Sequence, residues 1–99
     1  MVIVAGMYEL APELREAFLD SRKEAMRTSR EETGCLEYVA SADPIDPGRV
    51  VIFERWTSQE HLDAHLVAIR SRTGSAPIPI EWKKRSVMVY DVSAERPLI

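Results

Sequence analysis

The spacing of apolar residues along this chain alternates between that of strands and that of helices. Residues 2–10 (VIVAGMYEL) are mostly aliphatic or aromatic, which predicts a strand that ends before Pro12. From Pro12 the apolar residues recur at a period of about 3.6, which predicts a helix that ends at Thr33 and Gly34. The apolar side of that helix is formed by Leu14, Ala17, Phe18, Ala25 and Met26.

The middle of the chain predicts a β-hairpin. Residues 35–42 (CLEYVASA) and 50–56 (VVIFERW) are rich in strand-forming residues. Residues 43–49 between them (DPIDPGR) contain two Asp-Pro pairs and a glycine, which favour turns. We therefore expect the two segments to pair as antiparallel neighbours.

The last part of the chain predicts a second helix and a fourth strand. Ser58 is suited to cap a helix over residues 59–72, because its hydroxyl can accept a hydrogen bond from the first helical turn. Residues 75–80 contain two prolines and are expected to form an extended loop. A strand is expected over residues 84–92, whereas the tail from Ser93 to Ile99 carries no clear signal.

The resulting order, β-α-β-β-α-β, is that of the ferredoxin-like α+β fold with a four-stranded antiparallel sheet. Residues 1–99 are expected to form one domain, because so short a chain has no room for a second core. The helices of this fold cover one face of the sheet, yet both faces are apolar here: Val50 and Ile52 alternate with Val51 and Phe53. We therefore expect a homodimer in which two sheets pack face to face.

Composition narrows the possible partners. The net charge is −3, and the basic residues of the first helix alternate with acidic ones, so we expect a solvated helix face and no nucleic-acid partner. These basic residues are Arg15, Arg22, Lys23, Arg27 and Arg30. No segment approaches the roughly 20 consecutive apolar residues of a membrane span. The N-terminal segment lacks the basic residues of a signal peptide, so a cytoplasmic protein without a membrane partner is expected.

Sequence motifs for bound cofactors are absent. The four glycines are scattered, so neither a dinucleotide-binding nor a P-loop motif occurs. Cys35 is the only cysteine, which rules out an intrachain disulfide, and we expect it to be a small core residue. His61 and His65 are four residues apart, but the segment between them lacks the glutamate of a zinc-binding HExxH motif. We expect no metal and no cofactor.

The segment from Glu54 to His65 (ERWTSQEHLDAH) is the most informative part of the chain. It places Trp56 where a strand passes into a helix, and it places His65 on the apolar stripe of that helix. The other members of this stripe are Leu62, Leu66 and Ile69. A large aromatic ring and a titratable imidazole that converge on one cavity predict a ligand site.

Four short segments carry a resemblance to a known family. They are Gly34-Cys35-Leu36-Glu37-Tyr38, Asp46-Pro47-Gly48, Glu54-Arg55-Trp56-Thr57-Ser58, and the group Leu62, Ala64 and His65. In these segments the chain resembles the antibiotic biosynthesis monooxygenase family, and the resemblance covers most of residues 1–92. It implies the dimeric α+β barrel fold. Members of this family include cofactor-independent oxygenases, quinol oxygenases, haem degraders and isomerases.

The resemblance implies a monooxygenase that oxidises a small aromatic substrate, of the hydroquinone or anthrone type, to a quinone with O2 and without metal or flavin. The haem-degrading branch is not expected, because it is known for an asparagine at the haem site and this chain contains none. Members of the family often carry another histidine a few residues after the one that corresponds to His65, and this chain has none there. A mechanism with two imidazoles would therefore have to use His61. A non-catalytic small-molecule-binding dimer and an isomerase on the same fold remain open.

His65 and Trp56 are the candidate catalytic residues. His65 is either a base or hydrogen-bonding group, or a buried core histidine. Trp56 either stacks on the substrate and donates its indole N–H to a substrate oxygen, or closes a corner of the core. Glu54 shares a strand face with Trp56, and it could accept a proton, orient His65 or form an ion pair. Arg55 alternates to the opposite face.

Three aromatic residues complete the candidate substrate site. Tyr38 and Tyr8 offer phenolic hydrogen bonds, although tyrosines on half-buried strands commonly serve packing. Trp82 follows the predicted loop, where it either closes over the pocket or anchors the fourth strand. These assignments define a pocket between the helices and the sheet.

Overall fold

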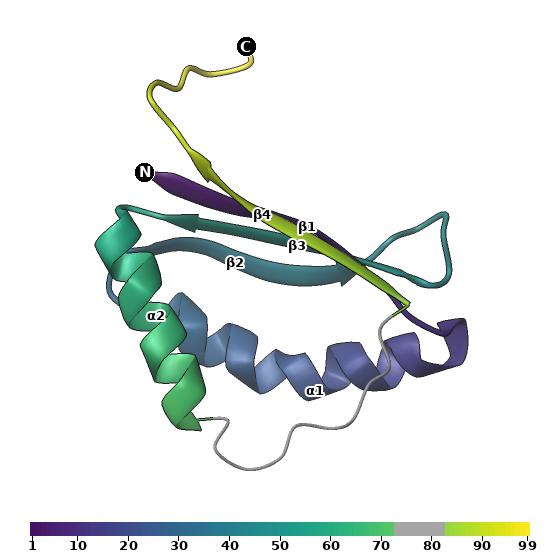
Figure 1. Cartoon of the computed structure of the whole chain (residues 1–99). Coiled ribbons are helices and arrows are strands. Elements are labelled where there is room, and N and C mark those ends of the chain that lie inside the picture. The colour runs from purple at the N-terminus through teal and green to yellow at the C-terminus, as the bar shows by residue number, and fades with distance from the viewer. Residues whose placement is uncertain (73–82) are drawn as a thin grey trace.

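The computed structural model describes residues 1–72 and 83–99 and confirms the predicted fold class. Four antiparallel strands form one sheet in the order β2-β3-β1-β4, and both helices lie on the same side of it (Figure 1). The elements are β1 (Val2–Glu9), α1 (Pro12–Arg30), β2 (Cys35–Ala42), β3 (Arg49–Trp56), α2 (Gln59–Arg72) and β4 (Lys84–Asp91). The predicted loop over residues 75–80 and Trp82 lie outside the described residues.

The end of α1 differs most from the prediction, because the helix stops at Arg30 rather than at Thr33. The backbone N–H of Glu32 donates to the carbonyl of Ser29 at 3.1 Å, a three-residue spacing that belongs to a turn rather than to an α-helix. Gly34 then adopts a positive φ of 84°, a conformation that favours glycine. This turn carries the side chain of Glu32 off the helix and toward α2.

The register of the sheet brings the candidate residues together. Tyr38 on β2 lies opposite Glu54 on β3, and Cys35 lies opposite Trp56. A bulge at Leu36 shifts the pairing between these two positions by one residue. Both Tyr38 and Trp56 therefore project to the face of the sheet that the helices cover.

The core lies between the helices and the sheet, in two clusters. One cluster lies under α2 and contains the predicted site aromatics; the other lies under the first half of α1. The first comprises Val2, Val4, Tyr38, Trp56 and Leu62. The second comprises Leu10, Phe18, Val50 and Ile52. The candidate residues Tyr38 and Trp56 are therefore part of the hydrophobic core.

The buried side of α1 differs from the predicted one. Leu14 is 42% exposed and Ala17 is also exposed, whereas Phe18 and Ser29 are buried. Arg22, which we expected on a solvated face, is half-buried because it lies one turn after Phe18 on the side that faces the sheet. The buried side of α1 is therefore partly basic.

Arg15 also departs from the expected solvated face. Its guanidinium donates to the carbonyl oxygens of Asp43 at 3.0 Å and Asp46 at 2.8 Å, in the loop that joins β2 to β3. The carboxylate of Asp43 in turn accepts the backbone N–H of Ile45 at 2.8 Å. These bonds hold the predicted hairpin turn against α1.

On α2 the buried stripe is narrower than the sequence indicated. Leu62 and His65 are buried, but Leu66 is 43% exposed because it lies about 100° around the helix from His65. Ser58 caps this helix as predicted, since its hydroxyl accepts the backbone N–H of His61 at 3.3 Å. Few apolar residues other than Leu62 therefore fix α2 to the sheet.

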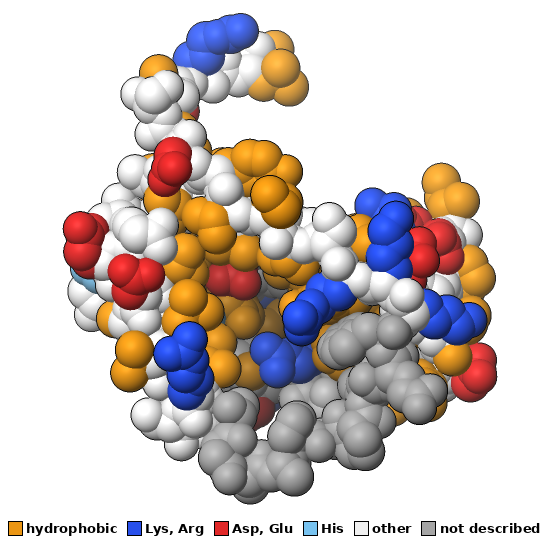
Figure 2. Space-filling view, viewed as in Figure 1, with side chains coloured by type: hydrophobic (Ala, Val, Ile, Leu, Met, Phe, Trp, Pro, Cys, Tyr) orange, Lys and Arg blue, Asp and Glu red, His pale blue; other side chains and the backbone are white. Residues whose placement is uncertain are grey.

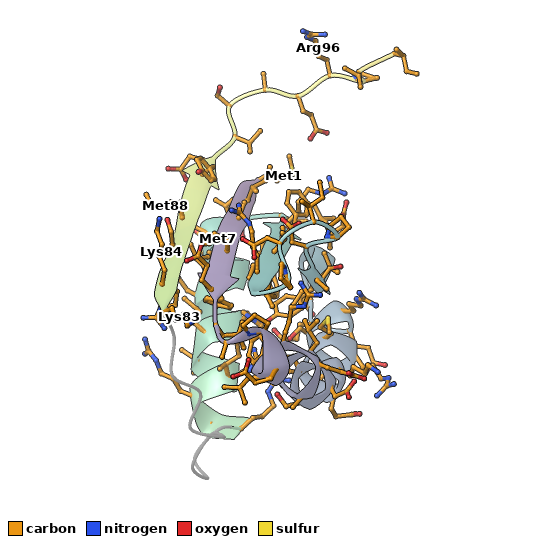
Figure 3. All side chains as sticks on the ribbon, turned by 90° about the vertical axis from the view of Figure 1, so that its right-hand side faces the viewer. Met1, Met7, Lys83, Lys84, Met88 and Arg96 are labelled. Atoms are coloured by element: carbon orange, nitrogen blue, oxygen red, sulfur yellow. The ribbon has the colours of Figure 1, made fainter. Side chains whose placement is uncertain are left out.

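The face of the sheet away from the helices is apolar and partly exposed. Val51 is 39% exposed, Met88 is 56% exposed and Tyr90 is 53% exposed. Figure 3 shows Lys84 and Met88 on the same side of β4, as the alternation along a strand requires. The apolar outer face expected from the sequence is therefore present.

Candidate functional site

Trp56, His65 and Tyr38 form one aromatic cluster. The rings of Trp56 and His65 lie 4.5 Å apart between centroids and are tilted by 36°. Tyr38 approaches His65 edge-on at 5.2 Å and Trp56 at 6.5 Å. Trp56 is fully buried and His65 is 2% exposed. The three predicted residues come from different elements: Trp56 from the end of β3, His65 from α2 and Tyr38 from β2. Their rings nevertheless lie together.

Glu32 holds the imidazole of His65. Its carboxylate lies 2.9 Å from Nδ1 of His65, and its other oxygen lies 2.6 Å from the guanidinium of Arg72 at the end of α2. An ionised carboxylate only accepts hydrogen bonds, so Nδ1 carries the proton and Nε2 keeps its lone pair. No hydrogen bond to Nε2 forms within the described part of the chain. The imidazole is therefore arranged to accept a proton or a hydrogen bond.

Glu54 binds Trp56 and not His65. The indole N–H of Trp56 donates to the Glu54 carboxylate at 3.0 Å, and both groups are buried. The indole N–H is thus already engaged, which differs from the role toward a substrate oxygen that the sequence suggested. The carboxylate that contacts the imidazole of His65 is that of Glu32, in the turn after α1, rather than that of Glu54.

The environment of Glu54 disfavours its charge. Burial raises the pKa of this carboxyl, and the indole N–H of Trp56, then His65, then Arg22, oppose that rise. Such a carboxyl accepts a proton more readily than an exposed one does. It is one of two groups in the cluster, with His65, that could exchange protons with a ligand.

A small enclosed cavity of about 30 Å³ lies beside Glu54, which is space for roughly one water molecule. Its polar lining comes from Glu54, Arg22 and the two tyrosines, Tyr8 and Tyr38. Burial raises the pKa of both phenols, and the charge of Arg22 opposes the rise. The remaining lining residues are Met26, Val39, Ala40 and Ile52. Tyr8 and Tyr38 therefore belong to the same polar site as Glu54.

Two residues of this site were not predicted from the sequence. Glu32 lies in a turn that the sequence assigned to the end of a helix, and no local pattern pairs it with a histidine 33 positions later. Arg22 carried a usable signal, because it falls one turn from Phe18 on the buried stripe. The alternation of basic and acidic residues along α1 instead suggested that Arg22 faces solvent.

His61 has a structural environment. Its Nδ1 lies 2.9 Å from the Thr57 hydroxyl and 2.7 Å from the Ser58 hydroxyl. Its ring packs over Gly34, where an added Cβ would overlap the imidazole. Among residues 1–72 and 83–99, no three His, Cys, Asp or Glu side chains are grouped so that they could hold a metal ion.

The helix side of the molecule is hollowed. Figure 2 shows a depression between α2 and β4 with acidic and basic side chains in its depth. A groove of about 210 Å³ also opens between α1 and α2, lined by Arg22, Glu24, Ala25, Thr28, Ile69 and Arg72. Arg22 lines both this groove and the enclosed cavity at Glu54. Neither helix among the described residues has the length and apolar character required to cross a membrane.

Comparisons with known proteins agree with this architecture. The family model described as antibiotic biosynthesis monooxygenase matches residues 1–68. An uncharacterised protein from Synechocystis is 30% identical over 64 residues, which is 65% of this chain and 44% of that protein. The chain thus spans less than half the length of the curated relative that it matches.

Solved structures share the whole fold at low identity. A Deinococcus radiodurans protein assigned to the antibiotic biosynthesis monooxygenases has a TM-score of 0.77 at 20% identity, covering 100% of this chain and 99% of its own. The heme degrader MhuD of Mycobacterium tuberculosis, solved with two hemes in its active site, has a TM-score of 0.74 at 15% identity. That match covers 98% of this chain and 100% of MhuD. Likeness at these identities establishes the fold and not the reaction.

Proposed function

Because the chain belongs to the antibiotic biosynthesis monooxygenase family, we propose that it is a cofactor-independent monooxygenase. Its substrate would be a small electron-rich aromatic compound, of the hydroquinone or anthrone type, and its oxidant O2. The observation that carries the proposal is the pair formed by His65 and Glu32, with Nδ1 and the carboxylate 2.9 Å apart. This pair supports removal of a proton from the substrate without help from a metal or flavin.

His65 would act as the base. Glu32 fixes the tautomer in which Nε2 has a free lone pair, and the carboxylate stabilises the imidazolium that forms after proton transfer. Trp56 and Tyr38 contact the imidazole and restrict its rotation. General-base catalysis by one positioned side chain contributes a factor of about 10² to 10⁴ in rate.

The electrons would come from the substrate itself. For an anthrone, loss of a ring CH2 proton to His65 gives a carbanion whose electrons pass to O2. A carbon–oxygen bond forms and the oxygen–oxygen bond breaks. The other oxygen leaves as water, with the second CH2 hydrogen and the proton that His65 returns. The balance is CH2 plus O2 to C=O plus H2O. Burial of Trp56 and His65 supports a site in which water is scarce, as the reduced-oxygen intermediate requires.

Trp56 has a supporting role in this proposal. Its ring lies against His65 and its N–H is bound to Glu54, so it positions the base and one carboxyl rather than a substrate oxygen. The enclosed polar cavity is bordered by Tyr8, Tyr38 and Glu54. A phenol or a water molecule there could donate a hydrogen bond to the substrate oxyanion. Trp82 stays a predicted wall of the pocket.

We also propose that the protein is a homodimer that packs sheet to sheet. The exposed side chains of Val51, Met88 and Tyr90 on the outer face support this arrangement, because monomeric proteins rarely leave such a patch open. A second copy would cover the same surface on both subunits, as two-fold symmetry requires. A cytoplasmic location also stays a prediction.

One observation favours a second candidate, an isomerase on the same fold. The carboxyl of Glu54, whose pKa is raised by burial, and the imidazole of His65 are both close to Trp56 and could pass a proton between two positions of a substrate. Such a reaction needs no oxygen. A non-catalytic dimer that only binds aromatic compounds is the third candidate.

Turnover with and without oxygen tests the proposal. Metal-stripped protein would be incubated with hydroquinones and anthrones, aerobically and anaerobically, and the products would be followed by absorbance. Protein-dependent quinone formation only in the presence of O2 supports the oxygenase. Anaerobic turnover supports the isomerase, and binding without turnover under either condition supports the binder.

A further inference from the structure

Arg22 forms the common wall of two spaces in the molecule. One is the enclosed cavity of about 30 Å³ beside Glu54, and the other is the open groove of about 210 Å³ between the helices. The groove has apolar contributions from Ala25 and Ile69, and Ile69 lies one turn after His65 on α2. Its volume is below the roughly 300–1,000 Å³ of pockets for drug-sized ligands, so it suits a molecule of one or two rings.

The charge of Arg22 is not matched by a close carboxylate. Among the described residues, no acidic side chain lies within ion-pair distance of its guanidinium. Two neighbours on the same helix differ: Lys23 binds Asp20 at 3.0 Å and Arg27 binds Glu24 at 3.0 Å. The guanidinium of Arg22 donates a hydrogen bond to the phenol of Tyr38, which is a neutral group. Without a paired anion, its other donors are incompletely used and it has lost part of its hydration.

In the groove the only carboxylate beside Arg22 among the described lining residues is that of Glu24, which is paired with Arg27. In the enclosed cavity the groups that face Arg22 are weak counter-ions. They are the phenols of Tyr8 and Tyr38, which burial keeps neutral, and Glu54, whose carboxylate already accepts the indole N–H of Trp56. The other arginine of the groove, Arg72, is bound to Glu32 at 2.6 Å. Arg22 is therefore the cation of this groove that a ligand can engage.

We propose that Arg22 selects the substrate by binding an acidic oxygen on the aromatic ring, so that the substrate class is a hydroxyaryl carboxylate of one or two rings. The planar guanidinium can donate two parallel hydrogen bonds to a carboxylate. The ring would then lie along the groove between α1 and α2. This inference rests on the proposed oxygenase function, because the ligand is a substrate only if the protein is that enzyme. Binding of the carboxylate by Arg22 can be measured without turnover.

Equilibrium binding of two redox-stable probes tests the inference. Hydroxynaphthoic acid carries the carboxylate, and naphthol lacks it. Calorimetric titration of the full chain should give an affinity for the acid at least about tenfold above that for naphthol, the worth of one charge-assisted contact. The net charge of −3 gives no general attraction to anions, so such a preference reports a local site.

Variants of two basic residues on α1 locate the preference. Arg22→Gln should bind the acid and naphthol equally, and Arg22→Lys should retain part of the preference. Lys23→Gln, which removes an exposed cation from the same helix whose partner Asp20 does not line the groove, should behave like the wild type. Far-ultraviolet circular dichroism would verify that each variant is folded.

The outcomes separate this inference from the oxygenase proposal. Equal affinity of the wild type for the two probes overturns the inference, as does a preference that persists in Arg22→Gln. The comparison within the wild type decides the matter even where a variant fails to fold. A carboxylate preference that depends on Arg22, found in a protein that consumes no oxygen, supports the inference and contradicts the oxygenase proposal.

Discussion

The imidazole Nδ1 of His65 lies 2.9 Å from the carboxylate of Glu32, across the gap between α2 and the turn that ends α1. This contact joins two segments that share no strand pairing, and it fixes which imidazole nitrogen carries the proton. The second carboxylate oxygen accepts a hydrogen bond from Arg72 at the end of α2. Glu32 therefore holds α2 at two positions, His65 and Arg72. The reactive geometry of His65 thus depends on a residue far away in the sequence.

Replacement of Glu32 tests this dependence. In Glu32→Gln the amide can donate to Nδ1 as well as accept from it, so the base-competent tautomer is no longer enforced. We expect turnover to fall by about 10- to 100-fold, with little change in substrate affinity.

Glu60→Gln, an exposed change in the first turn of α2, serves as the control for Glu32→Gln. It should leave both the rate and the substrate affinity unchanged. A Glu32→Gln variant with wild-type turnover would show that His65 does not rely on this carboxylate.

The raised pKa of Glu54 predicts how stability depends on pH. The folded state binds this proton more tightly than the unfolded chain does, so the stabilising contribution is complete below the ordinary pKa of 4.5. It is lost as the pH rises through the raised pKa. Glu54→Gln retains an acceptor for the Trp56 indole and has no charge to bury, so it should gain stability relative to the wild type as the pH increases.

Urea unfolding at several pH values between about 4 and 7 measures this difference in free energy of unfolding. Glu13→Gln, at an exposed position in the first turn of α1, corrects for the loss of one negative charge. A difference between Glu54→Gln and the wild type that stays constant over this range would contradict the assigned environment of Glu54.

The proposed dimer predicts a response to a charge on the outer face of the sheet. Met88→Glu places a carboxylate where the second sheet would pack, and the dimer should weaken by at least about tenfold in dissociation constant. Leu14→Glu makes the same kind of change on an exposed position of α1, which faces solvent in the proposed dimer, and should have no effect. Light scattering coupled to size exclusion reports the mass. A wild-type monomer, or equal behaviour of the two variants, would refute the sheet-to-sheet arrangement.

The fold could be predicted because its signals are local. The strand-forming segments of residues 35–42 and 50–56 and the turn residues between them identify a hairpin without reference to the rest of the chain. The cap at Ser58 and the apolar spacing after it likewise identify α2. The family model covers residues 1–68, which include the hairpin and most of α2.

The site could be predicted only in part, because its remaining contacts are tertiary. Trp56, Tyr38 and His65 were found from their positions in predicted elements, and the structure brings their rings together. Arg22 was assigned to solvent because acidic and basic residues alternate along α1, although its spacing from Phe18 indicated the buried side of the helix. Glu32 was not predicted as a site residue, because its contact with His65 depends on where α1 ends and on where α2 packs.

The most direct test of the central claim is oxygen consumption by the metal-stripped protein with hydroquinone and anthrone substrates, with the wild type and His65→Ala side by side. We expect protein-dependent oxygen uptake by the wild type that falls by about 10²- to 10⁴-fold in His65→Ala, the contribution of one general base. Quinone should form in proportion to the oxygen consumed. A folded wild-type protein with no uptake above the uncatalysed rate, or a His65→Ala variant as active as the wild type, would contradict the account.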